Sequence, residues 1–297
     1  MTYPIIHVPD HAGEMLEALG TKSKFWYSAD GKRVLYKEGR PESSEHWAEK
    51  VGCEICRLLG IPHAEYELAT WKGRKGVVSE TFVPDGGRLV FGNELLAKIV
   101  RGYQYAQRYR ARQHRITRVM SVVRSRGLGY PMGFVPPTEF RSAGDVFVGY
   151  LMLDALVANQ DRHHENWALI IDKNQQVTLS PTFDHASSLG RNERDESRLR
   201  RLNTRDSGDS MEHYASRAES AFYTLGGVKP LKTLEAFKEA ARISPPAARY
   251  WISWLDKVSV QEFEAIVKRI PESEISDAAR RFAVRLLEIN RARLLAW

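Results

Sequence analysis

The sequence predicts an α+β protein of two lobes, a small β-rich lobe followed by a larger helical lobe. The chain has 297 residues, of which 43% are hydrophobic and 27% charged, so it can bury one large core or two packed lobes. Strand patterns and tight-turn signals are concentrated before residue 85, whereas apolar residues at helical spacing dominate the remainder. The turn-forming run Pro84–Gly87 separates these patterns, and we therefore expect lobes at 1–85 and 86–297.

Composition and local pattern exclude three classes of protein. A chain disordered throughout would contain fewer apolar residues. No apolar run approaches the roughly 18 residues that a membrane span needs, and the N-terminal segment lacks the basic flank and long apolar centre of a secretory signal. The chain has 2 cysteines, which cannot form a disulfide framework. We therefore expect a cytoplasmic protein without a membrane span.

The two cysteines, Cys53 and Cys56, have C-x-x-C spacing inside a predicted helix. A thioredoxin-like motif lies at a helix N-terminus after a strand, and a zinc site would need two further ligands. We interpret both residues as buried thiols.

The elements of the small lobe follow from turn and cap signals. Asp30-Gly31 favours a tight hairpin turn, and Gly60 is typical of a helix C-terminus. The expected order is a hairpin of strands 25–27 and 33–37, a helix over about 44–59, and strands 64–71 and 76–82.

The large lobe is predicted to be mainly helical. The segment 145–158 is apolar on nearly all sides, which indicates a helix buried at the centre of the lobe. Strands 167–171 and 177–179 are expected to pair, and 231–297 shows the spacing of three or four amphipathic helices. The segment 191–209 is rich in charge and poor in apolar residues, so we predict a mobile surface loop there.

A basic helical insert is predicted at Leu95–Thr138. It contains no Asp or Glu but nine of the 44 Lys and Arg residues, which is more than the whole net charge of +7. Tyr103, Tyr105 and Tyr109 alternate with the arginines, as on surfaces that contact RNA. We expect the insert to bind an acidic or RNA-bearing partner; a merely solvated basic face has the same pattern.

Three polar residues form the most informative pattern of the sequence. Asp161 and Asn166 are five positions apart in the segment between the apolar helix and the following strand, and Asp184 comes after the next predicted hairpin. Phosphoryl transfer from ATP requires a carboxylate to receive the proton of the attacking hydroxyl and oxygen ligands to hold Mg²⁺. We therefore predict Asp161 as the catalytic base and Asn166 and Asp184 as metal ligands, in the order found in protein-kinase-like folds.

Residues upstream complete this pattern. Such a fold needs a lysine on a strand to contact the α- and β-phosphates and a glutamate on the next helix to fix it. Lys37 ends a predicted strand, and we prefer Glu49 over Glu45 as its partner because Glu49 lies nearer the middle of the helix.

Two further segments are predicted to bind the nucleotide. The segment 20–24 offers backbone amides, hydroxyls and an ammonium group suited to phosphates, with Thr21, Ser23 and Lys24 as the candidate residues. Glu80 and Phe82 lie where a hinge strand would present backbone groups to adenine.

The chain resembles the HipA-like serine/threonine kinase family. The resemblance covers about residues 20–218 and rests on the segments VLYKEG, CRLLGIP, VVSETFVPDG, NQDRHHENWALI and LSPTFDHASSLG in this order. It implies a bilobed protein-kinase-like fold with a small β-rich N-lobe and a larger helical C-lobe, ATP with Mg²⁺, and a protein Ser or Thr as acceptor. It also implies a catalytic base at Asp161, magnesium ligands at Asn166 and Asp184, and a phosphate contact at Lys37.

The resemblance has further implications for partners and regulation. Relatives often act as toxins in toxin–antitoxin operons, and several act on translation components. Some autophosphorylate a phosphate-loop serine, which would be Ser23 here. Only some twenty residues precede the predicted phosphate loop. We therefore expect a short form without the N-terminal subdomain of the long members, whose partner is an antitoxin or a separate protein carrying that subdomain.

Three alternative functions remain open at this stage. A small-molecule or phosphoinositide-type kinase would use a similar catalytic loop. A nucleotide-binding pseudokinase would act as a scaffold through the basic insert, although the complete set of polar residues favours an enzyme. A metal-dependent phosphohydrolase would use His163, His164 and Asp184 but lacks further ligands in order. We interpret the two histidines as structural residues around the catalytic loop.

Overall fold

The computed structural model describes residues 1–13 and 24–297, and within these ranges a sheet-rich part precedes a helical part. A five-stranded sheet is formed by β1 (Ile5–His7), β2 (Lys24–Ala29), β3 (Lys32–Glu38), β4 (Glu67–Trp71) and β5 (Arg74–Glu80). Its order is β1-β4-β5-β3-β2, in which β1 runs parallel to β4 and the other neighbours are antiparallel. The predicted hairpin is therefore present at one edge of the sheet.

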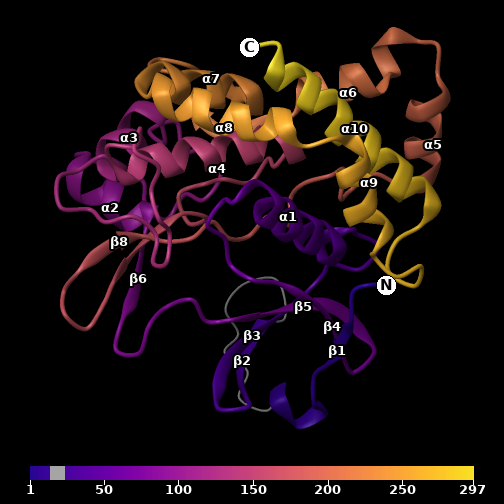
Figure 1. The fold of residues 1–297 in the computed structure, drawn as a ribbon, viewed down its shortest axis with the longest axis horizontal. Helices are drawn as coiled ribbons and strands as arrows, with labels where there is room; N and C mark the ends of the chain where they lie inside the picture. Colours follow the sequence, from indigo (N-terminus) through magenta and orange to yellow (C-terminus); the bar gives the residue numbers. More distant parts are fainter. Residues whose placement is uncertain (14–23) are drawn as a thin grey trace.

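Helix α1 (Glu45–Leu59) joins the sheet to the helical part (Figure 1). It contacts β4 and β5 on one side and α8 and α9 on the other. Its apolar residues Trp47, Val51 and Ile55 are buried in the same core cluster as the central helices. The helix ends at Gly60, which adopts the left-handed conformation that glycine accepts without strain, as its sequence predicts.

The remaining helices form the larger part of the molecule. They are α2 (Gly92–Ile99), α3 (Ile116–Val123), α4 (Ala143–Val157), α5 (Asp195–Asn203), α6 (Met211–Arg217), α7 (Thr233–Ile243), α8 (Pro245–Lys257), α9 (Val260–Lys268) and α10 (Asp277–Leu295). All residues of α4 are buried, and α3, α7, α8 and α10 pack around it (Figure 1). The apolar segment therefore forms the central helix that its composition predicts.

Two smaller sheets lie in this part of the chain. Strands β6 (Arg88–Phe91), β7 (Ala168–Ile171) and β8 (Val177–Leu179) form one, and β9 (Glu219–Tyr223) pairs with β10 (Pro230–Lys232). Gly92 follows β6 where an added Cβ would lie 2.2 Å from the Trp167 ring, so the chain passes too close to that ring for any larger residue. Strand β7 begins directly after Trp167, which follows the polar segment that holds Asp161 and Asn166.

Two expectations about local structure are corrected. The segment 191–209 is not wholly a loop, because it contains α5 and a 3₁₀ turn at Ser207–Asp209. Acidic residues in the first turn of α5 and arginines in its last turn match the helix dipole, and buried Arg198 donates to Ser44 Oγ at 2.7 Å. Charge pairing thus stabilises α5, although its sequence lacks a periodic apolar pattern.

The basic insert is helical only in part. Its beginning belongs to α2 and its later portion contains α3, but residues 100–115 form turns between these helices. Gly102 and Arg110 have φ values of 70° and 60°, which no residue of a right-handed helix adopts. Among the described residues, no helix is both long and apolar enough to cross a membrane.

Candidate active site

Lys37, Glu49 and Asp184 meet between the sheet and the helical part. Lys37 Nζ lies 3.1 Å from Glu49 Oε2 and 2.5 Å from Asp184 Oδ1. The other oxygen of Glu49 accepts a hydrogen bond of 2.5 Å from the backbone N–H of His185. Glu45, in contrast, accepts from the backbone of Arg40 and from Arg191. The geometry therefore pairs Lys37 with Glu49 and not with Glu45.

Three elements hold these residues in place. Lys37 is on β3, which is hydrogen-bonded to a neighbouring strand on each side. Glu49 is in the second turn of α1. Gly52, almost one turn beyond Glu49, allows the segment after Asp184 to approach, because an added Cβ would lie 2.9 Å from the Cβ of His185. Asp184 itself has a φ of 58°, a left-handed conformation that turns the chain at this point.

The electrostatics of the group favour its charged state. Burial opposes the charge on Lys37, but the carboxylates of Asp184 and Glu49 outweigh burial and hold the pKa of Lys37 well above its usual value. Burial likewise opposes the charge on Glu49, yet Lys37 and the hydrogen bond from His185 lower the pKa of Glu49. The lysine is therefore a fixed cation at neutral pH, as phosphate binding requires.

Asp161 lies on the segment that faces Asp184. Its Oδ2 accepts a hydrogen bond of 3.2 Å from Ser187 Oγ, and its backbone carbonyl accepts one of 2.7 Å from the Asn166 side chain. Burial raises the pKa of Asp161 above its usual value, and the nearby charge of Asp184 raises it further. The three residues of the D-x-x-x-x-N…D pattern are thus brought into one neighbourhood.

A buried ion pair fixes the segment that carries Asp161. Arg162 donates through Nε and Nη2 to both oxygens of Asp154 on α4, at 2.8 and 2.7 Å, and through Nη1 to the backbone carbonyl of Asn166 at 3.0 Å. Asn159 donates to Asp154 Oδ1 at 2.8 Å and accepts from the Asp161 backbone N–H at 3.1 Å. One carboxylate on the central helix therefore positions the start, middle and end of this segment.

The residues fit a magnesium ion. Mg²⁺ is held by carboxylate and amide oxygens, and Asn166 and Asp184 supply both types. The Asn166 amide donates through Nδ2 to Asp161, which leaves its Oδ1 as the atom that would bind a metal. The Asp184 charge raises the pKa of Asp161, so the two carboxylates repel one another, and a divalent cation would relieve this repulsion.

The residues predicted to bind the nucleotide differ in how close the structure places them to the Lys37 group. Lys24 begins β2 opposite Lys37, and burial lowers its pKa while the Asp184 carboxylate acts in the opposite direction, so Lys24 faces the same group. Thr21 and Ser23, and with them most of the predicted phosphate loop, lie outside the described residues. Glu80 ends β5 opposite Val34, three positions along the strand from the Lys37–Val77 pair, and its side chain pairs with Lys32 at 2.9 Å on an exposed surface.

Phe82 contacts the segment that leads to Asp184. Its ring stacks on Phe183 with centroids 5.8 Å apart and an interplanar angle of 26°. This contact places the segment after β5 directly beside the residue that precedes the predicted metal ligand.

A cavity of about 320 Å³ opens beside Asp161. Arg108, Arg110 and Arg191 are among the residues that line it, together with Tyr109. Arg108 pairs with Glu165 at 2.5 Å, and Arg191 pairs with Glu45. The cavity thus combines the candidate base with an excess of positive charge.

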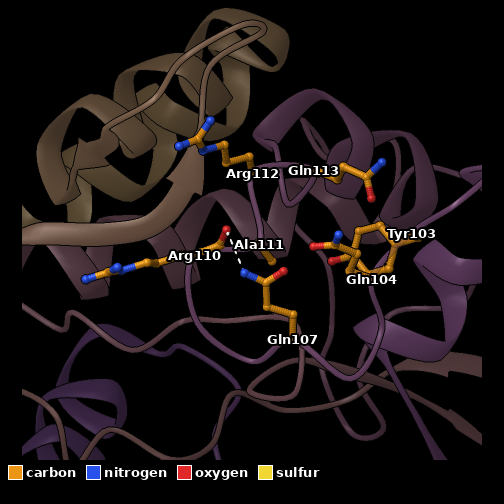
Figure 2. Close-up of a pocket in the computed structure, with 7 residues that line it drawn as sticks. All are labelled: Tyr103, Gln104, Gln107, Arg110, Ala111, Arg112 and Gln113. Carbon is orange, nitrogen blue, oxygen red and sulfur yellow. Dashed lines mark hydrogen bonds between the residues drawn. The ribbon is translucent and has the colours of Figure 1, made fainter.

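A second hollow of about 440 Å³ adjoins the first and shares Arg110 and Ala111 with it. Figure 2 shows its lining, which comes from the turns between α2 and α3 and includes Gln107, whose side chain donates to the Arg110 carbonyl. Tyr103 lines this hollow but is mostly buried, with its hydroxyl 2.7 Å from His164 Nδ1. Of Tyr103, Tyr105 and Tyr109, only the last two are exposed.

Sequence reasoning missed several residues that shape the site. Asp154 is a charged residue in an otherwise apolar stretch of helix, and this signal would have indicated a buried partner such as Arg162. Burial lowers the pKa of His163 to about 4, so the imidazole is neutral and structural. Ser187 and Arg191 follow Asp184 without a recognisable motif, and only the fold brings them to Asp161.

The fold and this group of residues together define a kinase-like protein. The chain belongs to the family of HipA-like C-terminal domains, whose model matches residues 17–251. The predicted family and the mixed α+β kinase-like fold are thereby confirmed. No curated protein matches the sequence.

Two solved structures share the fold. One is a Helicobacter pylori proinflammatory kinase, CtkA, with a TM-score of 0.71 and 15% identity over 99% of each chain. The other is the Shewanella oneidensis MR-1 toxin–antitoxin protein HipA, solved with HipB and operator DNA. Its TM-score is 0.60 at 13% identity, over 95% of this chain and 65% of that chain. At these identities the likeness concerns the fold.

Proposed function

We propose that this protein is an ATP- and Mg²⁺-dependent kinase that phosphorylates Ser or Thr side chains of a protein. The observation that carries the proposal is the contact of Lys37 Nζ with both Glu49 and Asp184, next to the segment that holds Asp161 and Asn166. Four separate stretches of the sequence contribute to this group. Membership of the HipA-like family supports the same chemistry.

In the proposed complex, Lys37 and Lys24 bind the ATP phosphates as cations. Thr21 and Ser23 are proposed to contribute backbone and hydroxyl donors, and the backbone around Glu80 and Phe82 to contact adenine. Asn166 and Asp184 would hold Mg²⁺, which supplies neutralisation of the phosphate charge.

Asp161 is proposed to orient the acceptor hydroxyl and to take its proton as the oxygen attacks the γ-phosphorus, while the bond to the ADP oxygen breaks. The carboxylate is suited to this role because Ser187 fixes one of its oxygens and Asn159 and Asn166 fix its backbone. Its raised pKa makes it a stronger base than an ordinary aspartate.

We propose an acidic protein segment as the acceptor. The cavity beside Asp161 is lined by three arginines, and the insert that supplies two of them contains no acidic residue. A carboxylate close to the acceptor hydroxyl would be attracted there. The same charge would attract a phosphoinositide or an RNA, so the test below identifies the labelled acceptor directly.

Incubation with radiolabelled ATP, Mg²⁺ and a protein extract tests the function. Asp161→Asn should reduce transfer of labelled phosphate by about 10²–10⁴-fold while nucleotide still binds, because only proton removal is lost. Asp256→Asn, at an exposed residue on α8, is the matched control and should keep full activity. Full activity of Asp161→Asn would refute the role of this residue, and label in lipid or a small molecule would favour the alternative kinase class.

Two finer proposals concern regulation. We propose that Ser23 is autophosphorylated, in which case Ser23→Ala removes self-labelling without preventing labelling of other proteins. We further propose a toxin-type role on a translation component with an antitoxin partner, as the Shewanella protein was solved with HipB. Expression of the wild type should then arrest growth, whereas expression of Asp161→Asn should not.

A further inference from the structure

Cys53, His63 and Glu65 come together behind the candidate active site. Cys53 lies in the middle of α1, and the other two residues lie between α1 and β4. Cys53 Sγ is 3.7 Å from Glu65 Oε2, and His63 Nε2 is 3.4 Å from Glu65 Oε1. One ligand atom from each residue can be chosen so that all three lie within 4.8 Å of one another. None of these residues belongs to the proposed kinase machinery.

The distance between His63 and Glu65 matches an edge of a zinc tetrahedron, and Cys53 lies close enough to complete a third corner. With Zn–N and Zn–O bonds of about 2.0–2.1 Å, two such ligands at a tetrahedral angle are about 3.3–3.4 Å apart. A sulfur at about 2.3 Å from zinc lies about 3.6 Å from an oxygen ligand. The separation of His63 Nε2 from Oε1 agrees with these values, whereas the contact of Cys53 is to Oε2, so binding through Oε1 requires the Cys53 and Glu65 side chains to turn until both reach the same ion. All three ligand atoms lie within 4.8 Å of one another, which keeps this adjustment within the range of side-chain rotation.

The protonation of His63 leaves a lone pair directed at an anion. Its Nδ1 lies 2.7 Å from the carbonyl of Ile61, which accepts a hydrogen bond and therefore requires the proton on Nδ1. In the neutral tautomer that this hydrogen bond selects, the second nitrogen, Nε2, carries the lone pair. In the described part of the chain, this buried Nε2 has no hydrogen-bond partner, and it faces the Glu65 carboxylate. A cation between the two atoms would turn this repulsion into attraction.

The surroundings also orient the other two ligands. Arg57 pairs with Glu65 through Oε2, which leaves Oε1 on the side of His63. A hydrogen bond from outside the ligand set to the second carboxylate oxygen is typical of metal sites. The Cys53 thiol donates to Glu65 Oε2, and a metal would displace this proton on binding.

We propose that Cys53, His63 and Glu65 bind a zinc ion, with water as the fourth ligand. A thiolate, an imidazole and a carboxylate form the donor set that zinc accepts, and their two negative charges balance Zn²⁺. Glu65 is 59% exposed, which gives the ion and its water a path from solvent. Binding replaces the S–H bond of Cys53 by a Zn–S bond and releases one proton to solvent.

The zinc site is linked to the segment of Asp184. The backbone N–H of Ala64 donates to the carbonyl of Thr182 at 2.8 Å, and the N–H of Thr182 donates to the carbonyl of Pro62 at 2.9 Å. Thr182 is two residues before Asp184. Zinc would therefore stabilise the connection between α1 and this segment, and Zn²⁺ should raise the melting temperature of the protein.

Zinc titration of the full chain tests the proposal. After treatment with a chelator, the protein should take up one Zn²⁺ per chain in competition with a chromophoric chelator and release about one proton. Cys53→Ser and Glu65→Gln should each weaken zinc binding at least tenfold and abolish the zinc-dependent rise in melting temperature. Glu65→Gln alters a mostly exposed residue, so it reports on binding even if Cys53→Ser impairs folding.

Cys56→Ala is the matched control, since Cys56 is buried in the same helix but is not part of the three-residue group. It should bind Zn²⁺ as the wild type does. With Co²⁺ in place of Zn²⁺, thiolate-to-metal charge-transfer absorption should appear in the wild type and in Cys56→Ala but not in Cys53→Ser. Absence of stoichiometric zinc from the wild type, or unchanged affinity in Cys53→Ser, would overturn the proposal.

Discussion

Glu49 is fully buried and contacts Lys37 with one carboxylate oxygen and the backbone of His185 with the other. Strand β3, helix α1 and the segment after Asp184 are therefore joined through a single side chain. Because a buried carboxylate is stable only when its oxygens are satisfied, this residue should control how Lys37 is held.

Glu49→Gln should reduce kcat/KM for ATP by about 10- to 100-fold, equivalent to about 1.4–2.7 kcal/mol of transition-state stabilisation. The neutral amide no longer balances Lys37, which then pairs more strongly with Asp184 and is less available to phosphate. Steady-state kinetics with varied ATP measure the effect. Glu45→Gln, one turn earlier, should leave KM for ATP unchanged because Glu45 contacts Arg40 and Arg191 instead. Equal losses in both variants would contradict this assignment.

Asp154→Asn should lower the free energy of unfolding by about 3–5 kcal/mol, because it leaves the buried charge of Arg162 without its partner. Urea denaturation measures this change. Asp209→Asn removes the partner of Arg200 and Arg201 near the surface and should have a much smaller effect, since water replaces the lost contact. A small effect of Asp154→Asn would show that the pair does not hold the segment of Asp161.

The sequence predicts the elements of this fold where a periodic apolar pattern or a cap marks them. The helix beginning at Asp277 is an example, since Ser276 caps it by accepting from Ala279 N–H. The contacts of Asp161 with Ser187 and of Arg162 with Asp154 leave no such pattern, because they join residues that only the folded chain brings together. Charge pairs also stabilise α5, where apolar periodicity is missing.

The C-x-x-C motif also shows that sequence spacing alone does not reveal which residues the fold brings together. Its spacing draws attention to Cys56, which the structure places outside the candidate ligand group. Cys53 instead meets His63 and Glu65, which come from the connection after the helix. A search for ligands by regular spacing therefore does not find this group.

His114 should make the protein less stable in acid. Burial lowers its pKa to about 3, so between about pH 3 and the usual value of 6.5 the unfolded chain binds a proton that the folded chain excludes. Stability therefore rises with pH through this window and is lost as pH falls, by about 1.4 kcal/mol per pH unit. Urea denaturation at several pH values between 4 and 7 measures the free energy of unfolding. The slope of this free energy against pH should be smaller in His114→Gln than in the wild type, whereas His7→Gln, on exposed β1, should keep the wild-type slope. An unchanged slope in His114→Gln would refute the prediction.

Ser187→Ala should move the acidic limb of the pH–rate profile to higher pH. The Ser187 hydroxyl donates to Asp161 and stabilises the charged carboxylate, so its removal raises the pKa of Asp161 further. A protonated carboxyl group cannot take the proton of the acceptor hydroxyl. As the pH is lowered, kcat/KM should therefore begin to fall at a higher pH in Ser187→Ala than in the wild type. Ser253→Ala, at an exposed helix position, should leave the profile in place. A downward shift in Ser187→Ala would contradict this role.

Arg110→Glu should weaken binding of an acidic acceptor without affecting ATP. Arg108 and Arg191 pair with carboxylates of this chain, whereas Arg110 has no carboxylate partner among the residues that the structure describes. Its charge is therefore available to a substrate at the cavity beside Asp161. The variant should raise KM for an acidic peptide about tenfold and reduce the dependence of KM on salt, because screening then has less attraction to weaken. Arg126→Glu makes the same charge change in the insert but away from the cavity, and it should alter KM far less. Equal effects of the two substitutions would show that the net charge of the insert, and not the Arg110 position, attracts the substrate.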